Sequence, residues 1–308
     1  MKCRLCSEDT AYKLGRVPDC KEFAGQSLKS PVSGDLWACR NCGSMFKYPI
    51  LPAKDYISLY ETAAGALWDT SKIHRNDIAR IYSYLSTRQV KSILDVGCFS
   101  GEFLNGISDN VEKYGIEPSV SAARIAQSLG VKIVAKTLDS LQPGKQFDVV
   151  VAIDVIEHIE DIRQFMEQAF SFVQSNGVLI ISTGDPECYW WKYLYKSMFW
   201  YSSYPEHITF PGYDFFSAFA KKNKLKKPIK IQFKYEDVSV AQKCIRLIGQ
   251  LAYFISPKVY GVLKKWMSFL LRGIDRDYDG LALGAAGVFK DHQVIIIQNE
   301  LENHLRIK

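Results

Sequence analysis

The sequence has no run of the roughly 18 to 20 uncharged apolar residues that would cross a bilayer, and its first residues, MKCRLC, lack the apolar core of a signal peptide. We therefore expect a cytoplasmic protein. Positive charge is also modest, because 39 basic and 33 acidic residues give a formal net charge of +6. This excess does not by itself indicate nucleic acid. The length of 308 residues suggests about two domains.

The eight cysteines predict a metal site rather than disulfides. Two Cys-x-x-Cys pairs, CRLC and CRNC, provide Cys3, Cys6, Cys39 and Cys42. Four thiolates fill the tetrahedral coordination of Zn²⁺ and leave no position for water, so we expect a structural zinc ribbon over residues 1–50, with a hairpin or loop between the pairs. Redox dithiols are the alternative, but such pairs normally begin a helix after a strand. The remaining cysteines are expected to be buried or partly buried thiols: Cys20, Cys98, Cys188 and Cys244.

Alternating strands and helices organise the rest of the chain. Residues 51–90 read as a helical linker or lid, with Ile78, Ile81 and Leu85 at helical spacing. From Lys91, short apolar runs alternate with helix-like stretches, which predicts an α/β fold with a doubly wound, mostly parallel sheet. We expect seven strands within residues 91–300, the last of them an antiparallel strand at QVIIIQ, preceded by a helical insertion at 239–288.

Glycines and carboxylates stand where these strands are expected to end, which is where ligands bind in such sheets. The stretch DVGCFSGEF lacks the G-x-G-x-x-G spacing that cradles a pyrophosphate. Glu117 ends the second strand and suits the two hydroxyls of a ribose, so a nucleoside without a pyrophosphate fits best. Phe99 between the glycines is compatible with the loop provided that its backbone avoids positive φ.

Four stretches in order, ILDVGCFSGEFL, YGIEPS, FDVVVAIDVIEHIED and GVLIIST, resemble the motifs of class I S-adenosylmethionine-dependent methyltransferases over residues 91–185. The resemblance implies that the loop glycines pass close to the methionine and ribose parts of the cofactor and that the carboxylates hold its ribose and aminoacyl ends. The residues concerned are Asp95, Gly97, Gly101, Glu117 and Asp154.

One position departs from that family pattern. An acidic residue after the third strand often contacts adenine in the family, but Thr137 occupies the matching position here and Asp139 follows two residues later. Together with Phe99, this departure motivates an alternative in which the chain is a catalytically degenerate, zinc-containing scaffold.

Two further stretches carry candidate catalytic residues. DVIEHIED places His158 after the fourth strand, and SYPEHITF places Tyr204, Glu206 and His207 beyond the fifth. Histidine is the usual base for removing a hydroxyl proton near neutral pH. Glu206 could fix a histidine tautomer or anchor a substrate hydroxyl, and Tyr204 could donate to an oxyanion. For His158, packing at a helix start is an equally open interpretation.

The cysteine segment, the methyltransferase motifs and the Tyr-x-Glu-His loop together resemble a bacterial group that includes methyltransferases of nucleotide-linked sugars. In that group the matching tyrosine, glutamate and histidines lie at the substrate. Its C-methylating members carry a large additional C-terminal domain, for which this chain is too short. The resemblance therefore implies methylation of a hydroxyl on a free, nucleotide-linked or lipid-linked glycan, with polysaccharide biosynthesis as the setting.

An amphipathic helical pair is expected in the insertion, from CIRLIGQLAYFI and KVYGVLKKWMSFLLRG. It could cover the sheet, form a dimer contact, or lie through residues 244–271 on the inner membrane surface, where a lipid-linked glycan would be found. The sequence leaves these three open. An RNA base methyltransferase docking through its zinc ribbon is a further alternative, but the Asn-Pro-Pro-aromatic motif of base amino-group methylation is absent after the fourth strand, so nucleic acid is not the expected partner.

Overall fold

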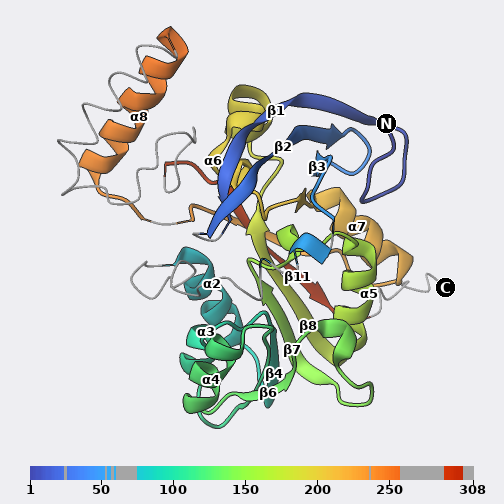
Figure 1. Ribbon diagram of the computed structural model, residues 1–308. Helices are drawn as coiled ribbons and strands as arrows, with labels where there is room; N and C mark the ends of the chain where they lie inside the picture. Colours follow the sequence, from blue (N-terminus) through green and yellow to red (C-terminus); the bar gives the residue numbers. More distant parts are fainter. Residues whose placement is uncertain are drawn as a thin grey trace.

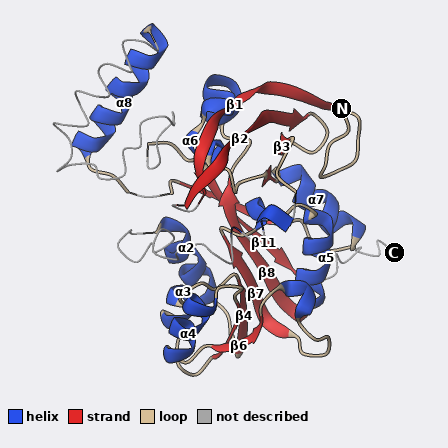
Figure 2. Cartoon of the chain, in the orientation of Figure 1, coloured by secondary structure: helices blue, strands red, loops and turns tan. Residues whose placement is uncertain are grey.

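Two sheets form the body of the protein in a computed structural model that describes residues 1–23, 26–52, 54–56, 59, 75–235, 237–256 and 288–300. A four-stranded sheet built mainly from the N-terminal segment sits beside one end of a seven-stranded sheet (Figures 1 and 2). The larger sheet carries helices on both faces, so the candidate site has to be sought along its edge, where the smaller sheet meets it.

The seven-stranded sheet has the strand order β10-β11-β8-β7-β4-β5-β6. β11 runs antiparallel to β8 and β10, and the other neighbouring pairs are parallel. The expected seven-stranded, mostly parallel sheet with an antiparallel last strand is therefore confirmed. Its strands are β4 (Ser92–Val96), β5 (Glu112–Ile116), β6 (Lys132–Ala135), β7 (Phe147–Ile153), β8 (Val173–Gly184), β10 (Ile229–Phe233) and β11 (His292–Gln298).

Both faces of this sheet are buried, as continuous apolar runs such as FDVVVAI require. Ile93 and Leu94 are adjacent in β4, yet they belong to separate core clusters on opposite faces. The face of Leu94 packs against α5 (Ile162–Ser171) and α7 (Tyr213–Lys222). The face of Ile93 packs against α2 (Asn76–Leu85), α3 (Glu102–Asn105) and α4 (Val120–Ser128), as Figure 1 shows.

The four-stranded sheet has the order β1-β2-β3-β9, from β1 (Ala11–Phe23), β2 (Gln26–Cys39), β3 (Met45–Tyr48) and β9 (Thr209–Phe210). β1 and β2 form the hairpin expected between the cysteine pairs, and Cys20 lies on β1. β3 pairs antiparallel with β9, which follows the Tyr204–His207 loop directly. The N-terminal segment is thus joined by backbone hydrogen bonds to a loop that the sequence predicts to be functional.

Short helices lie near the site residues. One is η3 (Ile156–His158), which follows β7. Three more lie between β8 and β9: η4 (Trp190–Tyr195), η5 (Lys196–Met198) and α6 (Trp200–Ser203). A further short turn, η2 (Leu138–Ser140), follows β6.

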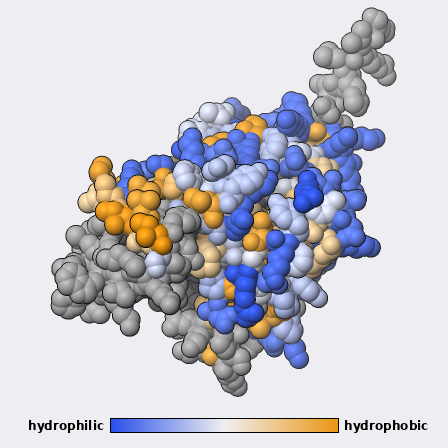
Figure 3. Space-filling model, turned by 90° about the horizontal axis from the view of Figure 1, so that it is seen from above, coloured by the Kyte–Doolittle hydropathy of each residue, from blue (hydrophilic) through white to orange (hydrophobic). Residues whose placement is uncertain are grey.

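The described part of the expected insertion is α8 (Val240–Ile255), which projects away from both sheets (Figure 1). It exposes Leu247, Ile248, Leu251 and Ile255, and hydrophobic residues gather on that side of the molecule in Figure 3. Cys244 is exposed as well, so the expectation that it is buried was wrong. The second amphipathic stretch, KVYGVLKKWMSFLLRG, lies outside the described residues. Among the described residues, none of the helices has both the length and the apolarity to traverse a bilayer.

Candidate active site at the strand ends

The loop after β4 has the geometry that its two glycines predict. Gly97 adopts a φ of +76°, and a Cβ added there would lie 2.6 Å from a Val155 methyl carbon. Gly101 caps the start of α3 with a φ of +80°. Both positions are left-handed, where any other residue would be strained, so the chain turns sharply out of the sheet at these points.

Phe99 also adopts positive φ, at +46°, so the condition set for this residue in the loop is not met. Its backbone N–H donates to Oε2 of Glu117 at 2.9 Å. The other carboxylate oxygen, Oε1, accepts from the N–H of Ser119 at 2.7 Å. A charge-assisted hydrogen bond of this kind offsets the cost of the strained backbone and ties the loops after β4 and β5 together.

Glu117 is nevertheless able to bind a ligand. It is 7% exposed at the end of β5, and burial raises the pKa of its carboxyl group. A carboxylate offers about four lone-pair positions, and the two backbone N–H groups use two of them. The remaining two match a pair of neighbouring hydroxyls. Asp95 lies nearby, where burial and the charge of Glu117 raise its pKa well above the usual value.

Asp154 follows β7 in a left-handed conformation, with a φ of +52°. Its Oδ2 accepts from a guanidinium nitrogen of Arg75 at 2.6 Å, whereas its buried Oδ1 has no hydrogen-bond partner among the described residues. Arg75 also binds Asp77 at 2.5 Å. A buried, unsatisfied carboxylate oxygen requires a donor, and a ligand ammonium group would supply one. Sequence reasoning missed Arg75, since nothing in its local pattern marks it.

Thr137 lies two residues beyond β6 and caps η2, where its hydroxyl contacts the Ser140 hydroxyl at 3.1 Å. Thr137 and Asp139 are both exposed. The position is at the ligand-binding edge of the sheet, as the sequence predicts, but neither side chain is buried or oriented by charge. A contact to adenine therefore stays a prediction for this position.

The four predicted catalytic residues are brought together by the short helix η3 and the loop before β9. The rings of His158 and His207 lie 4.9 Å apart between centroids, and the ring of Tyr204 lies 5.1 Å from that of His207. Glu206 is 6% exposed, and its buried Oε2 has no hydrogen-bond partner among the described residues. A second unsatisfied carboxylate oxygen at this edge again indicates room for a polar ligand group.

Backbone carbonyls orient both histidine rings. The Nδ1 atom of His158 lies 3.1 Å from the Glu206 carbonyl oxygen, and that of His207 lies 2.9 Å from the Tyr201 carbonyl oxygen. For His207, this carbonyl assigns the ring proton to Nδ1 and the lone pair to Nε2. Burial lowers the pKa of His158 to about 4 and that of His207 well below its usual value, so both rings are neutral.

Glu157 is a site residue that sequence reasoning missed, although it directly precedes His158. It is fully buried, accepts from Thr183 at 3.0 Å and from the Tyr201 hydroxyl, and burial raises its pKa to about 8. Ligand atoms of Glu157, His158 and His207 lie within 4.8 Å of one another. One divalent cation can bind three such atoms, so the cluster can act either through a free histidine or through a bound cation.

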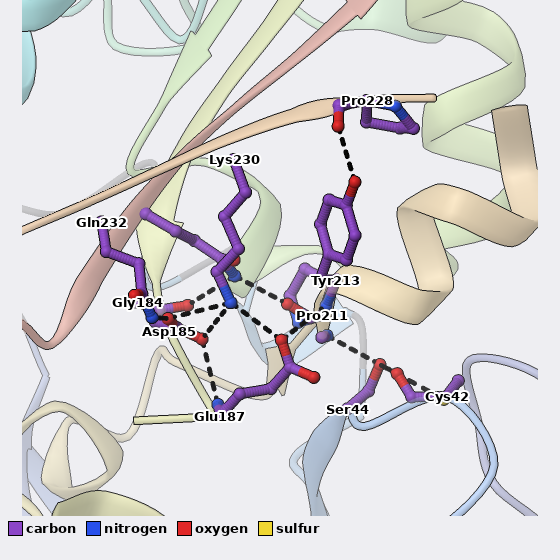
Figure 4. Close-up of polar contacts among 12 residues, drawn as sticks. Cys42, Ser44, Gly184, Asp185, Glu187, Pro211, Tyr213, Pro228, Lys230 and Gln232 are labelled. Atoms are coloured by element: carbon purple, nitrogen blue, oxygen red, sulfur yellow. Dashed lines mark hydrogen bonds and ion pairs between the residues drawn. The ribbon is translucent and has the colours of Figure 1, made fainter. Parts of the chain in front are cut away.

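A polar network joins the end of β8 and β10 to the start of α7, next to the N-terminal segment (Figure 4). Lys230 lies 3.0 Å from Asp185 and 2.8 Å from Glu187, which also accepts from the N–H of Tyr213 at 3.2 Å. The hydroxyl of Ser44, next to the second cysteine pair, accepts from the N–H of Gly212 at 2.9 Å. The cysteine segment is therefore held in a defined position beside the catalytic loop.

The four cysteines of the two pairs converge, as predicted from their spacing. The sulfur atoms of Cys3 and Cys42 are 3.8 Å apart, and those of Cys6 and Cys39 are 3.6 Å apart. Sulfur atoms around a tetrahedral Zn²⁺ ion lie about 3.8 Å apart when each Zn–S bond is about 2.3 Å. The N–H of Leu5 and the side-chain amide of Asn41 point at sulfur atoms of the cluster. The donor set and its spacing fit zinc.

The sheet order, the glycine loop after β4 and the buried carboxylate after β5 define the class I S-adenosylmethionine-dependent methyltransferase fold. Residues 71–226, just over half of the chain, match the model of a family described as a methyltransferase domain. The chain belongs to this methyltransferase family.

Curated relatives carry the same kind of domain. An enzyme of Rickettsia typhi named ubiquinone biosynthesis O-methyltransferase is 31% identical over 120 residues, which cover 36% of this chain and 44% of the relative. An enzyme of the same name from Rhodopseudomonas palustris is 29% identical over 163 residues, which cover 44% of this chain and 64% of the relative. The chain thus spans under half the length of the first of these. It is also similar to the structure of a methyltransferase from Thermotoga maritima, with 15% sequence identity and a TM-score of 0.47. The match covers 73% of this chain and 88% of the other.

Proposed function

We propose that this protein transfers a methyl group from S-adenosylmethionine to a hydroxyl of a sugar or related small molecule. The observation that carries the proposal is the convergence of His158, Glu206 and His207 beside the strand ends that present Glu117 and Asp154. The curated relatives support transfer to oxygen, since they are named as O-methyltransferases. The preference for a glycan acceptor comes from the resemblance of the Tyr-x-Glu-His loop to that of methyltransferases of nucleotide-linked sugars. The curated relatives do not support this preference, since they are named for ubiquinone biosynthesis.

Each residue has a role that its surroundings support. When bound, S-adenosylmethionine supplies a sulfonium methyl group that an oxygen nucleophile attacks in line. Glu117 would accept from the ribose hydroxyls, and the unpartnered Oδ1 of Asp154 would accept from the ammonium group. The Nε2 atom of His207 would take the acceptor's hydroxyl proton, with Glu206 anchoring a second hydroxyl. Much of the barrier reduction would come from orientation of the two reactants.

The acceptor class can be tested directly. Radiolabelled S-adenosylmethionine would be incubated with the protein and with nucleotide-linked sugars, extracted lipid-linked glycans or dihydroxybenzenes in parallel. We expect incorporation of label into one of these hydroxyl-bearing classes. A protein that binds S-adenosylmethionine but labels none of them, or labels RNA instead, would contradict the proposal.

We propose that the four-cysteine cluster holds one structural Zn²⁺ ion, because its sulfur spacing suits a closed tetrahedral site. Elemental analysis of the purified protein should give one zinc ion per chain, and the double substitution of serine for Cys39 and Cys42 should remove it. The midpoint of thermal unfolding should fall by several degrees, since structural zinc contributes folding free energy.

Cys20→Ser on β1 is the matched control and should keep both the zinc and the unfolding midpoint. Zinc that stays bound in the double variant at full stoichiometry would contradict this site. Zinc retained in that variant would point to Glu157, His158 and His207, the second group of described residues whose ligand atoms lie close enough together to bind an ion.

We also propose that the protein contacts membranes through α8, which supports a lipid-linked acceptor. Leu251 and Ile255 are 62% and 82% exposed on this helix. Tyr193 on η4 and Tyr189, directly before it, are exposed as well. We expect sedimentation with anionic lipid vesicles that weakens as salt is raised. The variant Leu251→Gln should reduce sedimentation, whereas Val134→Gln, at an exposed apolar position of β6, should not. Equal recovery in the supernatant with and without vesicles would contradict the proposal.

A further inference from the structure

Three aromatic side chains form a wall at the ligand-binding edge of the large sheet. Trp200 begins α6, Tyr204 directly follows that helix, and Tyr235 lies two residues beyond β10. The ring centroid of Trp200 is 6.1 Å from that of Tyr204 and 5.7 Å from that of Tyr235. Tyr204 is 44% exposed, and the other two rings are partly exposed. Partly exposed aromatic rings gathered at such an edge are typical of a ligand-binding surface.

This aromatic wall runs from the proposed cofactor end of the site to the proposed base. At one end, the guanidinium carbon of Arg75 lies 5.4 Å from the ring centroid of Tyr235, and Arg75 binds Asp154. At the other end, the ring of Tyr204 lies 5.1 Å from that of His207. Methyl transfer requires the acceptor to lie between the sulfonium methyl group and the base. The aromatic wall lies along this line.

A buried carboxylate fixes two rings of the wall. The Nε1 atom of Trp200 donates to Oδ2 of Asp291 at 3.0 Å, and the backbone N–H of Tyr235 donates to Oδ1 at 3.3 Å. Asp291 is 0% exposed, and its Oδ1 also lies 3.0 Å from Nδ1 of His292. The ring of His292 stacks on that of Trp200 at 5.7 Å. The wall is therefore already ordered, which lowers the entropy cost of binding a ligand on it.

The direction of β11 explains how this carboxylate comes to the site. Asp291 directly precedes β11, whose first residue, His292, pairs with Gly184 at the end of β8. Because β11 is antiparallel to β8, its start lies at the edge where the parallel strands end. The single antiparallel strand of the expected fold thus carries an anchor for the aromatic wall.

We propose that the aromatic wall binds the face of a six-membered ring in the methyl acceptor, with a hydroxyl at the edge of that ring directed towards His207. The inference rests on the proposed function and narrows its acceptors to ring compounds with an apolar face. Two sources share this chemistry: the C–H face of a sugar ring and the π face of a dihydroxybenzene. Trp200, Tyr204 and Tyr235 contact the ring, and Asp291 is a positioning residue that acts through Trp200 and Tyr235.

The test is saturation-transfer NMR in the presence of S-adenosylhomocysteine, with uridine diphosphate glucose and 1,2-dihydroxybenzene as separate probes. We expect the wild type to transfer saturation to the sugar-ring protons of the first probe or to the ring protons of the second, which identifies the source of the ring. Trp200→Leu should raise the Kd of that probe at least about fivefold, as loss of stacking on an aromatic ring predicts. Trp190→Leu is the matched control, because Trp190 is 38% exposed on η4, and it should bind as the wild type does.

Two further variants separate binding from folding. Tyr204→Leu changes an exposed side chain and should also raise the Kd, whereas Tyr204→Phe keeps the ring and should not. Asp291→Asn has one oxygen where the carboxylate has two, so it cannot accept from all three of its partners. It should raise the Kd of the probe and leave that of S-adenosylhomocysteine unchanged, a difference that a general loss of stability would not produce.

The inference would be overturned if neither probe received saturation or if only the uracil protons of the first did. An unchanged Kd in either Trp200→Leu or Tyr204→Leu would overturn it as well. If folded wild-type protein fails to bind S-adenosylhomocysteine itself, the proposed function fails first, and the two failures are thereby told apart.

Discussion

Substituting alanine for Glu117 should raise the Kd for S-adenosylmethionine at least about 100-fold. Two hydrogen bonds from ribose hydroxyls to a charged acceptor would be lost, and each contributes about 1.5 to 3 kcal/mol. The loop would also lose its anchor, because Glu117 accepts from the N–H of Phe99 at 2.9 Å and of Ser119 at 2.7 Å. Phe99 would then keep its strained left-handed backbone without compensation.

Isothermal titration calorimetry measures this effect, and Glu112→Ala provides the control. Glu112 begins the same strand, its side chain is 54% exposed, and its loss should leave the Kd unchanged. Circular dichroism would establish that both variants are folded. A folded Glu117→Ala protein whose Kd stays within about twofold of the wild type would show that this carboxylate does not hold the cofactor.

Substituting alanine for His207 should leave cofactor binding intact and reduce turnover by about 100-fold to 10,000-fold, the range expected for loss of a positioned base. Its ring is fixed by the Nδ1 contact to the Tyr201 carbonyl at 2.9 Å, which directs Nε2 away from that carbonyl. The low pKa keeps the ring neutral and able to accept a proton near pH 7. The described ring contacts of His207 include neither Glu117 nor Asp154, so cofactor binding and catalysis should separate.

The measurement is single-turnover methyl transfer at saturating cofactor, together with calorimetry on the same preparation. Ile229→Ala is a suitable control, since Ile229 is 41% exposed on β10. Wild-type turnover in the His207 variant would remove it as the base. A parallel loss of cofactor binding would show that the ring supports the fold of the site instead.

The cofactor loop could be predicted from the sequence because its determinants are local. Gly97 and Gly101 are needed where the chain turns left-handed. Glu117 directly follows β5, which lies next to β4 in the sheet. Register along adjacent parallel strands brings such residues to one edge without further information. The same logic placed His158 and His207 together, since they follow β7 and β8, which are adjacent.

Contacts between distant segments could not be predicted in the same way. Arg75 reaches Asp154 across 79 positions, and Lys47 reaches Tyr204 across 157. The pairing of β3 with a two-residue strand, β9, gives no periodic signal in the sequence. The hydrogen bond from the Phe99 N–H to the carboxylate of Glu117, 18 positions away, likewise has no local signal in the sequence.

The most direct test of the account is calorimetric titration of the purified wild-type protein with S-adenosylmethionine. We expect saturable binding at one molecule per chain, because we propose that the glycine loop, the buried Glu117 and the unsatisfied Oδ1 of Asp154 form one site. No detectable binding by folded, zinc-loaded protein would contradict it and would leave a methyltransferase fold that no longer uses its cofactor.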